Sequence, residues 1–384
     1  MCALGIQPGL GRMRKLLAQL GHPERGLNFI HLAGTNGKGS TAAAIDSMLR
    51  EAGFFSGLYT SPHLVEFRER FRCGGVMVEK ELLGKSVEAV MRAIGKWPSR
   101  GRPTFFEATT AVALLIFREA KVDFVVWETG LGGRLDATNV VMPECCVLTS
   151  LGRDHETILG KGWANLGMEK AGILKRGVPV FSAPWPKAAE KILAARAKKL
   201  RCPWQVVKPL AKSEKCLPLM GGHQRQNLAL AVAVGRYLGL PESMLRRGLE
   251  RTFWPGRFHR LPGRGRVVVD GAHNLEGVKV AMETWRNMFG KNPERVIFGC
   301  LRDKPAELML GEIRKTGAEL WGVELNDLRG TNPLEWGVHP DRLWSCVDEA
   351  FQEEKRDPLK GGTLILGSLV LVGEILRAAG ERAG

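Results

Sequence analysis

The sequence predicts an α/β protein whose first domain has a largely parallel sheet and whose second domain is a smaller unit of the same kind. Short apolar β-type runs alternate with helical stretches over most of the chain, which is the pattern of βαβ units. Two of these runs, residues 122–128 and 145–150, are apolar on both faces, as expected of strands that helices cover on both sides of the sheet. The alternation restarts after residues 253–266, a stretch rich in Pro, Gly and Arg that is typical of a domain boundary.

The elements of the first domain follow from local patterns. Residues 122–128 are apolar on both faces and predict a central strand, and Gly53 ends the helix that precedes the second strand. In chain order we expect a strand at 27–34, a helix at 40–53, a strand at 55–61, a helix at 104–120, strands at 122–128 and 145–150, and a helix at 223–239.

The second domain repeats the alternation on a smaller scale. We expect strands at 266–274, 295–300, 318–325 and 363–367, with a helix after each of the first two strands and a closing helix after the last. The predicted domains are therefore residues 1–256 and 257–384. Residues 183–222 give little information, apart from a Lys- and Arg-rich stretch with Ala and Leu whose spacing suits an amphipathic helix with a solvated basic face.

Composition restricts the possible partners. The chain of 384 residues has a formal net charge of +16, which suits nucleic acid, small anionic substrates or merely a basic surface. The basic stretch lacks the interleaved aromatic residues that stack on bases, so we expect no nucleic-acid partner. No apolar run reaches the roughly 18 residues of a membrane span, and no membrane partner is expected. The eight cysteines show no C-x-x-C pair, which favours reduced thiols and a cytoplasmic location.

The stretch HLAGTNGKGS, residues 31–40, predicts a phosphate-binding loop between a strand and a helix. Its glycines let backbone N–H groups turn toward a phosphate, and the helix N-terminus adds a favourable dipole. Lys38 offers a positive charge to the β- and γ-phosphate oxygens, and the hydroxyl of Ser40 or Thr41 offers a ligand to Mg²⁺. The alternative is a Gly-rich turn without a ligand, but the order of strand, loop, lysine, hydroxyl and helix favours a nucleotide.

Three residues beyond the loop are candidates for the same site. Glu128 closes an apolar strand, where a Walker-B acid would stand, although a strand-end carboxylate in water is an open alternative. His155 follows the next strand at the edge where α/β sheets bind ligands. Lys170 resembles, from its neighbours alone, a surface lysine paired with Glu169.

In the second domain, Asp270, His273 and Asn274 lie where a strand passes into a helix. Such polar groups suit a ligand-binding crevice, whereas Asn274 is equally suited to capping the helix. Arg257 could place its guanidinium on a phosphate, or be one of many surface arginines.

Taken together, the chain resembles the folylpolyglutamate synthase/dihydrofolate synthase family, a branch of the Mur-ligase-type ATP-dependent amide ligases. The resemblance implies a P-loop ATPase domain followed by a Rossmann-like C-terminal domain, with the active site between them. The stretches that carry it occur in the family's order: HLAGTNGKGS, YTSPHLVEFRERF, FFEATTAVALLIF, FVVWETGLGGRLDATNV, LGRDHETILG, EKAGILK, GGHQRQNLALA, WPGRF, VVVDGAHN, LRDKP and LILGSLVLVGE.

The resemblance also implies roles for individual residues. It implies a first Mg²⁺ held by Ser40, Ser61 and Glu128, a second held by His155, and carbamylation of Lys170, which turns a cation that would repel the metals into an anion. Asp136 matches a position that contacts the pterin. The implied catalytic residues are Lys38, Lys170, Arg257 and His273; the implied ATP-binding residues are Gly34, Thr35, Asn36, Gly37, Lys38, Gly39, Ser40, Thr41, Asn227, Arg257 and Asp270.

The reaction implied by the resemblance joins L-glutamate to dihydropteroate, to reduced folate, or to both, through an acyl phosphate made from ATP. A monomer is expected. The open alternatives are an enzyme with folylpolyglutamate synthase activity alone, a P-loop NTPase that acts with nucleic acid, and a binding protein that has lost catalysis. A cell-wall peptide ligase would need a further domain ahead of the first strand, where only about 26 residues stand.

Overall fold

The computed structural model describes residues 7–95, 97–98, 101–211 and 218–381. The chain forms two compact units. The first comprises Met1–His63, Arg68–Pro218 and Arg225–Phe253, and the second comprises Leu64–Phe67, Leu219–Gln224 and Trp254–Gly384. The last boundary between the two units, between Phe253 and Trp254, thus lies at the start of the predicted linker, residues 253–266.

The first unit is built on a mostly parallel sheet of eight strands in the order β4-β3-β2-β5-β1-β6-β7-β8. In this order, the strands β2, β5, β1, β6, β7 and β8 run parallel to one another. The β3 and β4 strands form an antiparallel edge beside β2. Their bounds are β1 Phe29–Ala33, β2 Ser56–Tyr59, β3 Phe71–Cys73, β4 Val76–Met77, β5 Phe124–Glu128, β6 Pro143–Leu148, β7 Val180–Ser182 and β8 Trp204–Val206.

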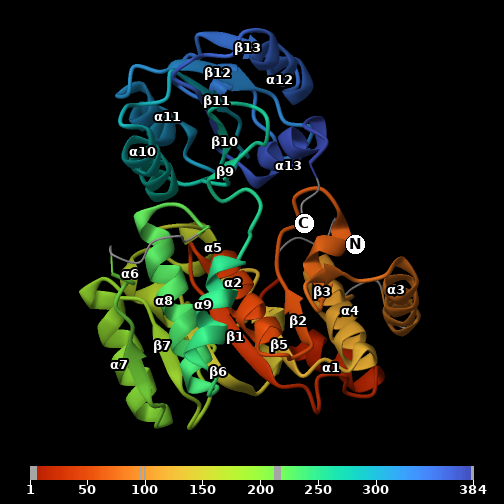
Figure 1. The fold of residues 1–384 in the computed structure, drawn as a ribbon. Coiled ribbons are helices and arrows are strands. Elements are labelled where there is room, and N and C mark those ends of the chain that lie inside the picture. The colour runs from red at the N-terminus through yellow and green to blue at the C-terminus, as the bar shows by residue number, and fades with distance from the viewer. Residues whose placement is uncertain (1–6, 96, 99–100, 212–217, 382–384) are drawn as a thin grey trace. The chain divides into compact units, whose positions relative to one another are not determined.

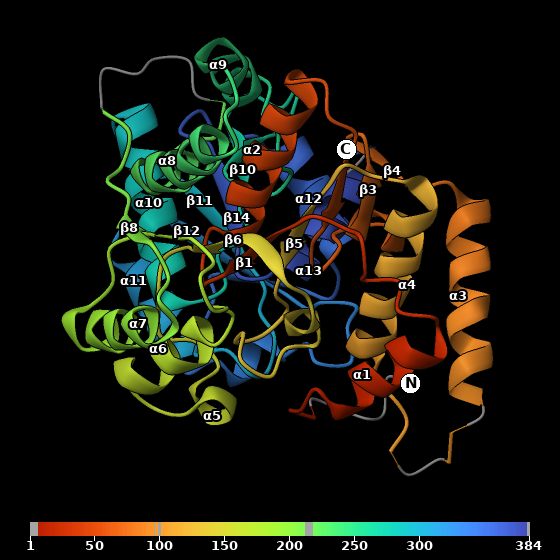
Figure 2. The same cartoon turned by 90° about the horizontal axis from the view of Figure 1, so that it is seen from below.

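Helices cover this sheet. The α2 helix packs against α9, and Figure 1 shows α8 beside both. On the other flank α1, α3 and α4 pack together, as Figure 2 shows. The bounds are α1 Gly11–Gln19, α2 Lys38–Glu51, α3 Lys80–Gly95, α4 Phe105–Ala120, α5 Glu156–Leu159, α6 Trp163–Ala171, α7 Lys187–Leu200, α8 Gly222–Tyr237 and α9 Glu242–Glu250, with short 3₁₀ turns η2 Phe67–Arg70 and η3 Ala137–Val140.

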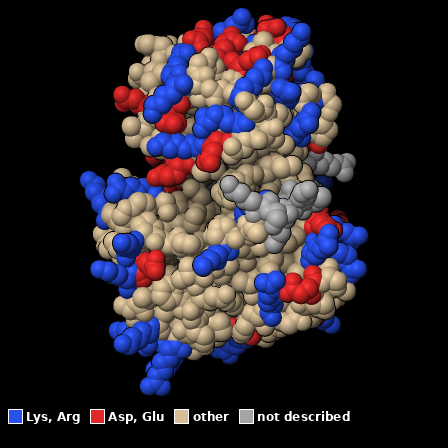
Figure 3. Space-filling view, turned by 60° about the vertical axis from the view of Figure 1, so that its left-hand side comes forward, with Lys and Arg blue, Asp and Glu red and all other residues tan. Residues whose placement is uncertain are grey.

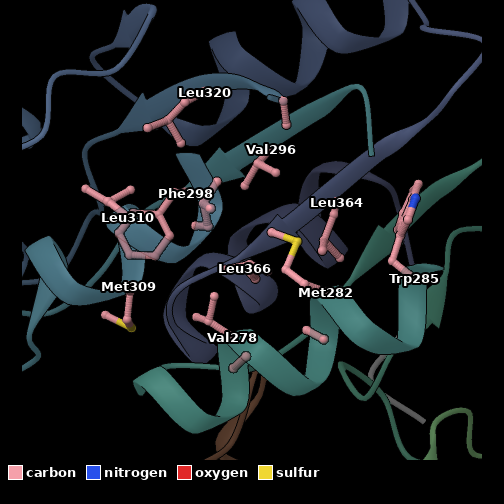
Figure 4. Close-up of a cluster of buried hydrophobic side chains, with 14 of the residues drawn as sticks. Val278, Met282, Trp285, Val296, Phe298, Met309, Leu310, Leu320, Leu364 and Leu366 are labelled. Atoms are coloured by element: carbon pink, nitrogen blue, oxygen red, sulfur yellow. The ribbon is translucent and has the colours of Figure 1, made fainter. Parts of the chain in front are cut away.

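The second unit has a six-stranded sheet in the order β13-β12-β11-β14-β10-β9, parallel except for β9. Apolar side chains of α10 and α11 meet those of β11, β12 and β14 in the core that Figure 4 shows. The bounds are β9 His259–Arg260, β10 Val267–Val269, α10 Leu275–Phe289, β11 Arg295–Phe298, α11 Ala306–Arg314, β12 Glu319–Val323, η4 Pro333–Glu335, β13 Arg342–Trp344, α12 Val347–Arg356, β14 Thr363–Leu366 and α13 Leu369–Ala378.

The predicted fold class is confirmed. The prediction for the basic stretch is also confirmed, because α7 buries Ala189, Leu193 and Ala197 along one face and exposes its lysines. Residues 212–217 lie outside the described part of the chain. The prediction missed several elements, among them α1, α3 and α9 of the first unit and β13 and α12 of the second. The β13 strand has only three residues and α12 is rich in charge. Within the described residues, no helix is long and apolar enough to cross a membrane.

Candidate active site

Four strand ends meet at one edge of the first unit's sheet. In the order β2-β5-β1-β6 all four strands run parallel, so the segments that follow them lie side by side at the carboxyl edge. These segments hold Ser61 after β2, Glu128 at the end of β5, the loop 34–37 after β1, and His155 after β6. The arrangement brings the predicted residues of the first domain to one edge.

The loop before α2 has a backbone that only glycine adopts readily. Gly37 has φ 89° and caps α2, and a Cβ added there would lie 2.2 Å from Oδ1 of Asn227. A Cβ on Gly34 would lie 1.8 Å from Oγ1 of Thr149. Both glycines are therefore required by close packing as well as by backbone conformation. The N-terminus of a 14-residue helix opens on the loop, which suits an anion.

Lys38 and Glu128 lie next to each other at this loop. The Nζ atom of Lys38 donates to the carbonyl oxygens of Gly34 and Thr35, each at 3.2 Å, and lies 3.9 Å from Oε1 of Glu128. The other carboxylate oxygen of Glu128 accepts the backbone N–H of Ser61 at 3.1 Å. Glu128 is thus a buried carboxylate held in place, and the interpretation of a strand-end glutamate in water is wrong.

The hydroxyl groups of the loop differ in their partners. Oγ1 of Thr41 donates to the carbonyl of Asn227 at 3.4 Å. Oγ of Ser40 is buried and has no hydrogen-bond partner among the described residues. A buried hydroxyl without a partner costs free energy, and a cation would satisfy it. Ser40 lies two residues after Lys38 in α2, and Oε1 of Glu128 lies 3.9 Å from Nζ of Lys38. The oxygens of Ser40 and Glu128 therefore suit a Mg²⁺ ion, which prefers hard oxygen ligands.

The remaining ligands of such an ion would not come from a cluster of side chains. Among the described residues, no group of three or more His, Cys, Asp and Glu side chains could hold a metal ion. Mg²⁺ commonly takes one or two protein ligands and completes its shell with water and substrate phosphates, so this arrangement fits a nucleotide-bound ion.

His155 lies beside Asp154 after β6. Its backbone has φ 54°, its N–H donates to Oδ1 of Asp154 at 2.9 Å, and its Nε2 lies 3.8 Å from the same oxygen. Its imidazole is partly exposed. A second metal at this position stays a prediction.

Lys170 is the residue whose position differs most from what its neighbours indicated. The surface interpretation is wrong: Lys170 is 4% exposed, and Glu169 pairs with Arg134 at 2.7 Å instead. Burial, together with the charge of Lys38, lowers the pKa of Lys170 to about 7, although nearby carboxylates, with Asp154 the strongest, act in the opposite direction. A lysine of this kind is uncharged in a large fraction of molecules near neutral pH.

Asp136 is buried in the turn after β5. Its Oδ1 accepts the N–H of Thr138 at 3.0 Å and the hydroxyl of Thr138 at 2.5 Å, and its Oδ2 accepts the N–H of Leu131 at 2.8 Å. Burial raises the pKa of Asp136 while these hydrogen bonds lower it. The carboxylate thus organises its own turn, and its contact with a pterin stays a prediction.

The predicted residues of the second unit gather at the start of α10. The carboxylate of Asp270 accepts the N–H groups of Phe258 and Ala272 at 2.7 and 2.8 Å. The Nδ1 atom of His273 lies 2.7 Å from the carbonyl of Gly271. Asn274 caps α10 by accepting the N–H of Gly277 at 2.8 Å, which confirms the capping interpretation.

Arg257 and a histidine that was not predicted belong to the same cluster. A Cβ on Gly271 would lie 2.7 Å from Nη1 of Arg257, so the guanidinium lies against this turn. Burial lowers the pKa of His223, while the charge of Asp270 raises it and that of Arg257 lowers it. The only sequence signal for His223 is its place in the matching stretch GGHQRQNLALA.

Known proteins resemble this chain in sequence and in fold. No protein-family model matches the chain. A dihydrofolate synthase/folylpolyglutamate synthase of Bacillus subtilis is 40% identical over 97% of this chain and 95% of its own length. The chain belongs to the folylpolyglutamate synthase/dihydrofolate synthase family. It is accordingly an ATP-dependent ligase.

Solved structures of the family support the assignment. Escherichia coli FolC in complex with DHPP and ADP has a TM-score of 0.87 and 28% identity, and the match covers 98% of this chain and 94% of that one. The AMPPCP complex of a folylpolyglutamate synthase has a TM-score of 0.85 and 28% identity, with 96% of each chain covered. The Mur-ligase-like fold expected from the resemblance is therefore confirmed for this member of the family.

Proposed function

We propose that this ligase joins L-glutamate both to dihydropteroate and to the γ-carboxylate of reduced folate, using ATP to activate the acceptor carboxylate. The observation that carries the proposal is the grouping at the N-terminus of α2 of Lys38, Glu128 and a Ser40 hydroxyl that has no hydrogen-bond partner in the part of the chain that the structure describes. That group suits a triphosphate with its metal. The alternative within the family is an enzyme with folylpolyglutamate synthase activity alone.

The residues that would bind ATP have distinct tasks. The backbone N–H groups of residues 34–41 would cradle the phosphates, and Lys38 would face the β- and γ-oxygens. Ser40, Ser61 and Glu128 would hold a first Mg²⁺, and His155 a second. Bound Mg²⁺ neutralises charge on the phosphate oxygens. We assign residues 1–256 to this ATPase domain and residues 257–384 to the Rossmann-like domain, whose Arg257, Asp270 and His273, with Asn227, would meet the nucleotide.

Lys170 suits carbamylation. Its amine is buried, and its pKa is lowered to about 7, so a neutral nitrogen is available to attack CO₂. The N–C bond forms as the amine loses a proton, and the product is an anion. That anion would relieve the repulsion between Lys170 and Lys38 that the positive amine creates.

The proposed reaction has two steps, phosphoryl transfer and amide formation. An oxygen of the acceptor carboxylate attacks the γ-phosphorus, the bond to the β-phosphate oxygen breaks, and ADP leaves. The neutral amine of L-glutamate then attacks the carbonyl carbon of the acyl phosphate, its nitrogen loses one proton to solvent as the amide bond forms, and inorganic phosphate leaves with the original carboxylate oxygen. Lys38 and Arg257 would stabilise negative charge on the transferring group. The Asp136 carboxylate would orient the pterin ring of the acceptor.

The test supplies purified protein with ATP, Mg²⁺ and labelled L-glutamate, and with either dihydropteroate or tetrahydrofolate. We expect label in the product with each acceptor. Label with tetrahydrofolate alone would leave only the single-activity alternative, and label with neither would refute the proposal. We further propose that the enzyme is a cytoplasmic monomer that needs no nucleic acid, so added RNA or DNA should leave its rate of ATP hydrolysis unchanged.

A further inference from the structure

A buried chain of hydrogen bonds links His31 and Thr138 to the Asp136 carboxylate. His31 and Thr138 have no role in the chemistry above. His31 lies on the central strand β1 with 0% exposure. Its Nε2 atom lies 3.0 Å from Oγ1 of Thr138, a residue 107 positions away in the chain. That hydroxyl in turn lies 2.5 Å from Oδ1 of Asp136. Three polar side chains thus form one continuous line that ends at the carboxylate.

The direction of these hydrogen bonds follows from a count of protons. The hydroxyl of Thr138 has one proton, and a carboxylate can only accept, so Thr138 donates to Asp136. Nε2 of His31 must then carry a proton and donate to Thr138. The opposite direction would put the ring proton on Nδ1, which has no partner among the described residues, and a buried N–H without an acceptor is costly.

The imidazole is neutral in this environment. Burial, assisted by the charge of Lys175, lowers the pKa of His31 to about 3. Thr138 is also fixed from a second side, because its carbonyl accepts the indole N–H of Trp127 at 3.0 Å. With Leu131 bound to Oδ2, both oxygens of Asp136 are fixed, and so is the plane of its carboxylate.

A purely structural role accounts poorly for this arrangement. His31 stands between the apolar residues Ile30 and Leu32 in the sequence of a wholly buried strand. A hydrocarbon side chain at this position would avoid the cost of burying an imidazole. A carboxylate of fixed plane, by contrast, can recognise an N–H donor that arrives in that plane. Among the described residues, Oδ1 of Asp136 accepts two hydrogen bonds and Oδ2 accepts one, so the remaining acceptor site lies on Oδ2. The 2-amino group and the ring N–H of a pterin are donors of the kind that such a site would bind.

We propose that His31 and Thr138 are positioning residues that fix the Asp136 carboxylate for recognition of the acceptor's pterin ring. This inference rests on the proposed function. It gives His31 and Thr138 a part in acceptor specificity through their hydrogen bonds to Asp136, without contact with the acceptor itself.

Steady-state kinetics of substituted enzymes test it. Thr138→Val removes the hydroxyl at nearly constant volume, and we expect the KM for dihydropteroate and tetrahydrofolate to rise about tenfold, the change that 1.4 kcal/mol of binding produces. The KM for ATP and kcat should stay within about twofold, well inside that 1.4 kcal/mol. Thr138→Ser, which restores the hydroxyl, should return the acceptor KM to near the wild-type value.

Thr252→Val is the matched control, because Thr252 is also buried in the first unit and bonds only to the carbonyl of Gly248 among the partners described. It should leave the acceptor KM unchanged. An unchanged acceptor KM in Thr138→Val, or equal changes in every kinetic constant, would overturn the inference. Inactive wild-type protein would instead indicate failure of the proposed function.

A second measurement avoids substitutions that could impair folding. Nitrogen NMR of ¹⁵N-histidine-labelled wild-type protein reports which ring nitrogen carries the proton, with His31→Gln used to assign the signal. We expect the Nε2–H tautomer of a neutral ring. A ring protonated at Nδ1 would reverse the chain of hydrogen bonds and contradict the proposal.

Discussion

Among single residues, Lys170 shows most clearly how burial changes chemistry. An ammonium group in water stays charged at neutral pH, but burial of the Lys170 side chain penalises its charge and brings its pKa to about 7. The folded-state pKa is thus below the ordinary value. The amine is mostly protonated below pH 7 and mostly neutral above it, and only the neutral amine binds CO₂.

We predict that Lys170→Ala abolishes turnover and that added bicarbonate does not restore it, since no amine remains to be carbamylated. Wild-type enzyme depleted of CO₂ below pH 7 should lose activity and regain it when bicarbonate is added above pH 7. Glutamate incorporation measures both effects. Lys161→Ala is the control, because Lys161 is exposed and lies in the same segment. Near-wild-type activity of Lys170→Ala would dismiss the carbamate.

Chain order alone predicted which residues lie at the carboxyl edge of the sheet, while their roles in binding stay predictions. The strand–loop–helix order indicated Lys38 and Ser40, and a strand end indicated Glu128. The burial of Lys170 was not predictable from its residue type, because lysine is mostly exposed in proteins, although it lies one helical turn from the buried Leu166. The contact between His31 and Thr138 joins residues 107 positions apart, and only the assembled sheet brings them together.

At the scale of elements, the joint between β1 and α2 determines whether phosphate can be bound. Gly37 begins this helix at φ 89°, with Asn227 packed where a side chain would go. A Cβ there must displace Asn227 or the loop backbone, and either movement shifts the N–H groups that would meet the phosphates.

Gly37→Ala should therefore raise the KM for ATP at least about tenfold, a loss of 1.4 kcal/mol in binding. Gly53→Ala is a matched control, because Gly53 has nearly the same φ of 88° but no atom within 4 Å of an added Cβ. It should lower thermal stability modestly, as left-handed strain costs about 1 kcal/mol, without changing the KM for ATP. Equal effects of the two substitutions on that KM would show that strain, not the clash with Asn227, governs binding.

Element-level prediction was accurate for strands with long apolar runs and for helices with clear ends. The α4 helix begins at the predicted position because Thr104 and Glu107 form a capping box. Short elements such as β8 and β13 have too few residues to show a period, and their pairing with neighbouring strands defines them instead.

At the scale of the whole molecule, the net charge of +16 does not by itself indicate the partner. On the face in Figure 3, Lys and Arg side chains are scattered among uncharged and acidic residues and form no continuous stripe. Such a surface suits small anionic substrates such as ATP, glutamate and folates through general attraction. The two α/β units were predictable because the alternation of strands and helices restarts after the linker. The function of the two units was predictable only from the sequence motifs and their order along the chain.

The central claim is that ATP activates a carboxylate on the way to an amide. Oxygen transfer tests it directly: the acceptor is labelled with ¹⁸O in its reacting carboxylate and incubated with ATP, Mg²⁺ and L-glutamate. An acyl phosphate requires one labelled oxygen to leave with phosphate, so mass spectrometry should find one ¹⁸O per inorganic phosphate and one retained in the amide. Unlabelled phosphate formed in step with the amide product would contradict the account.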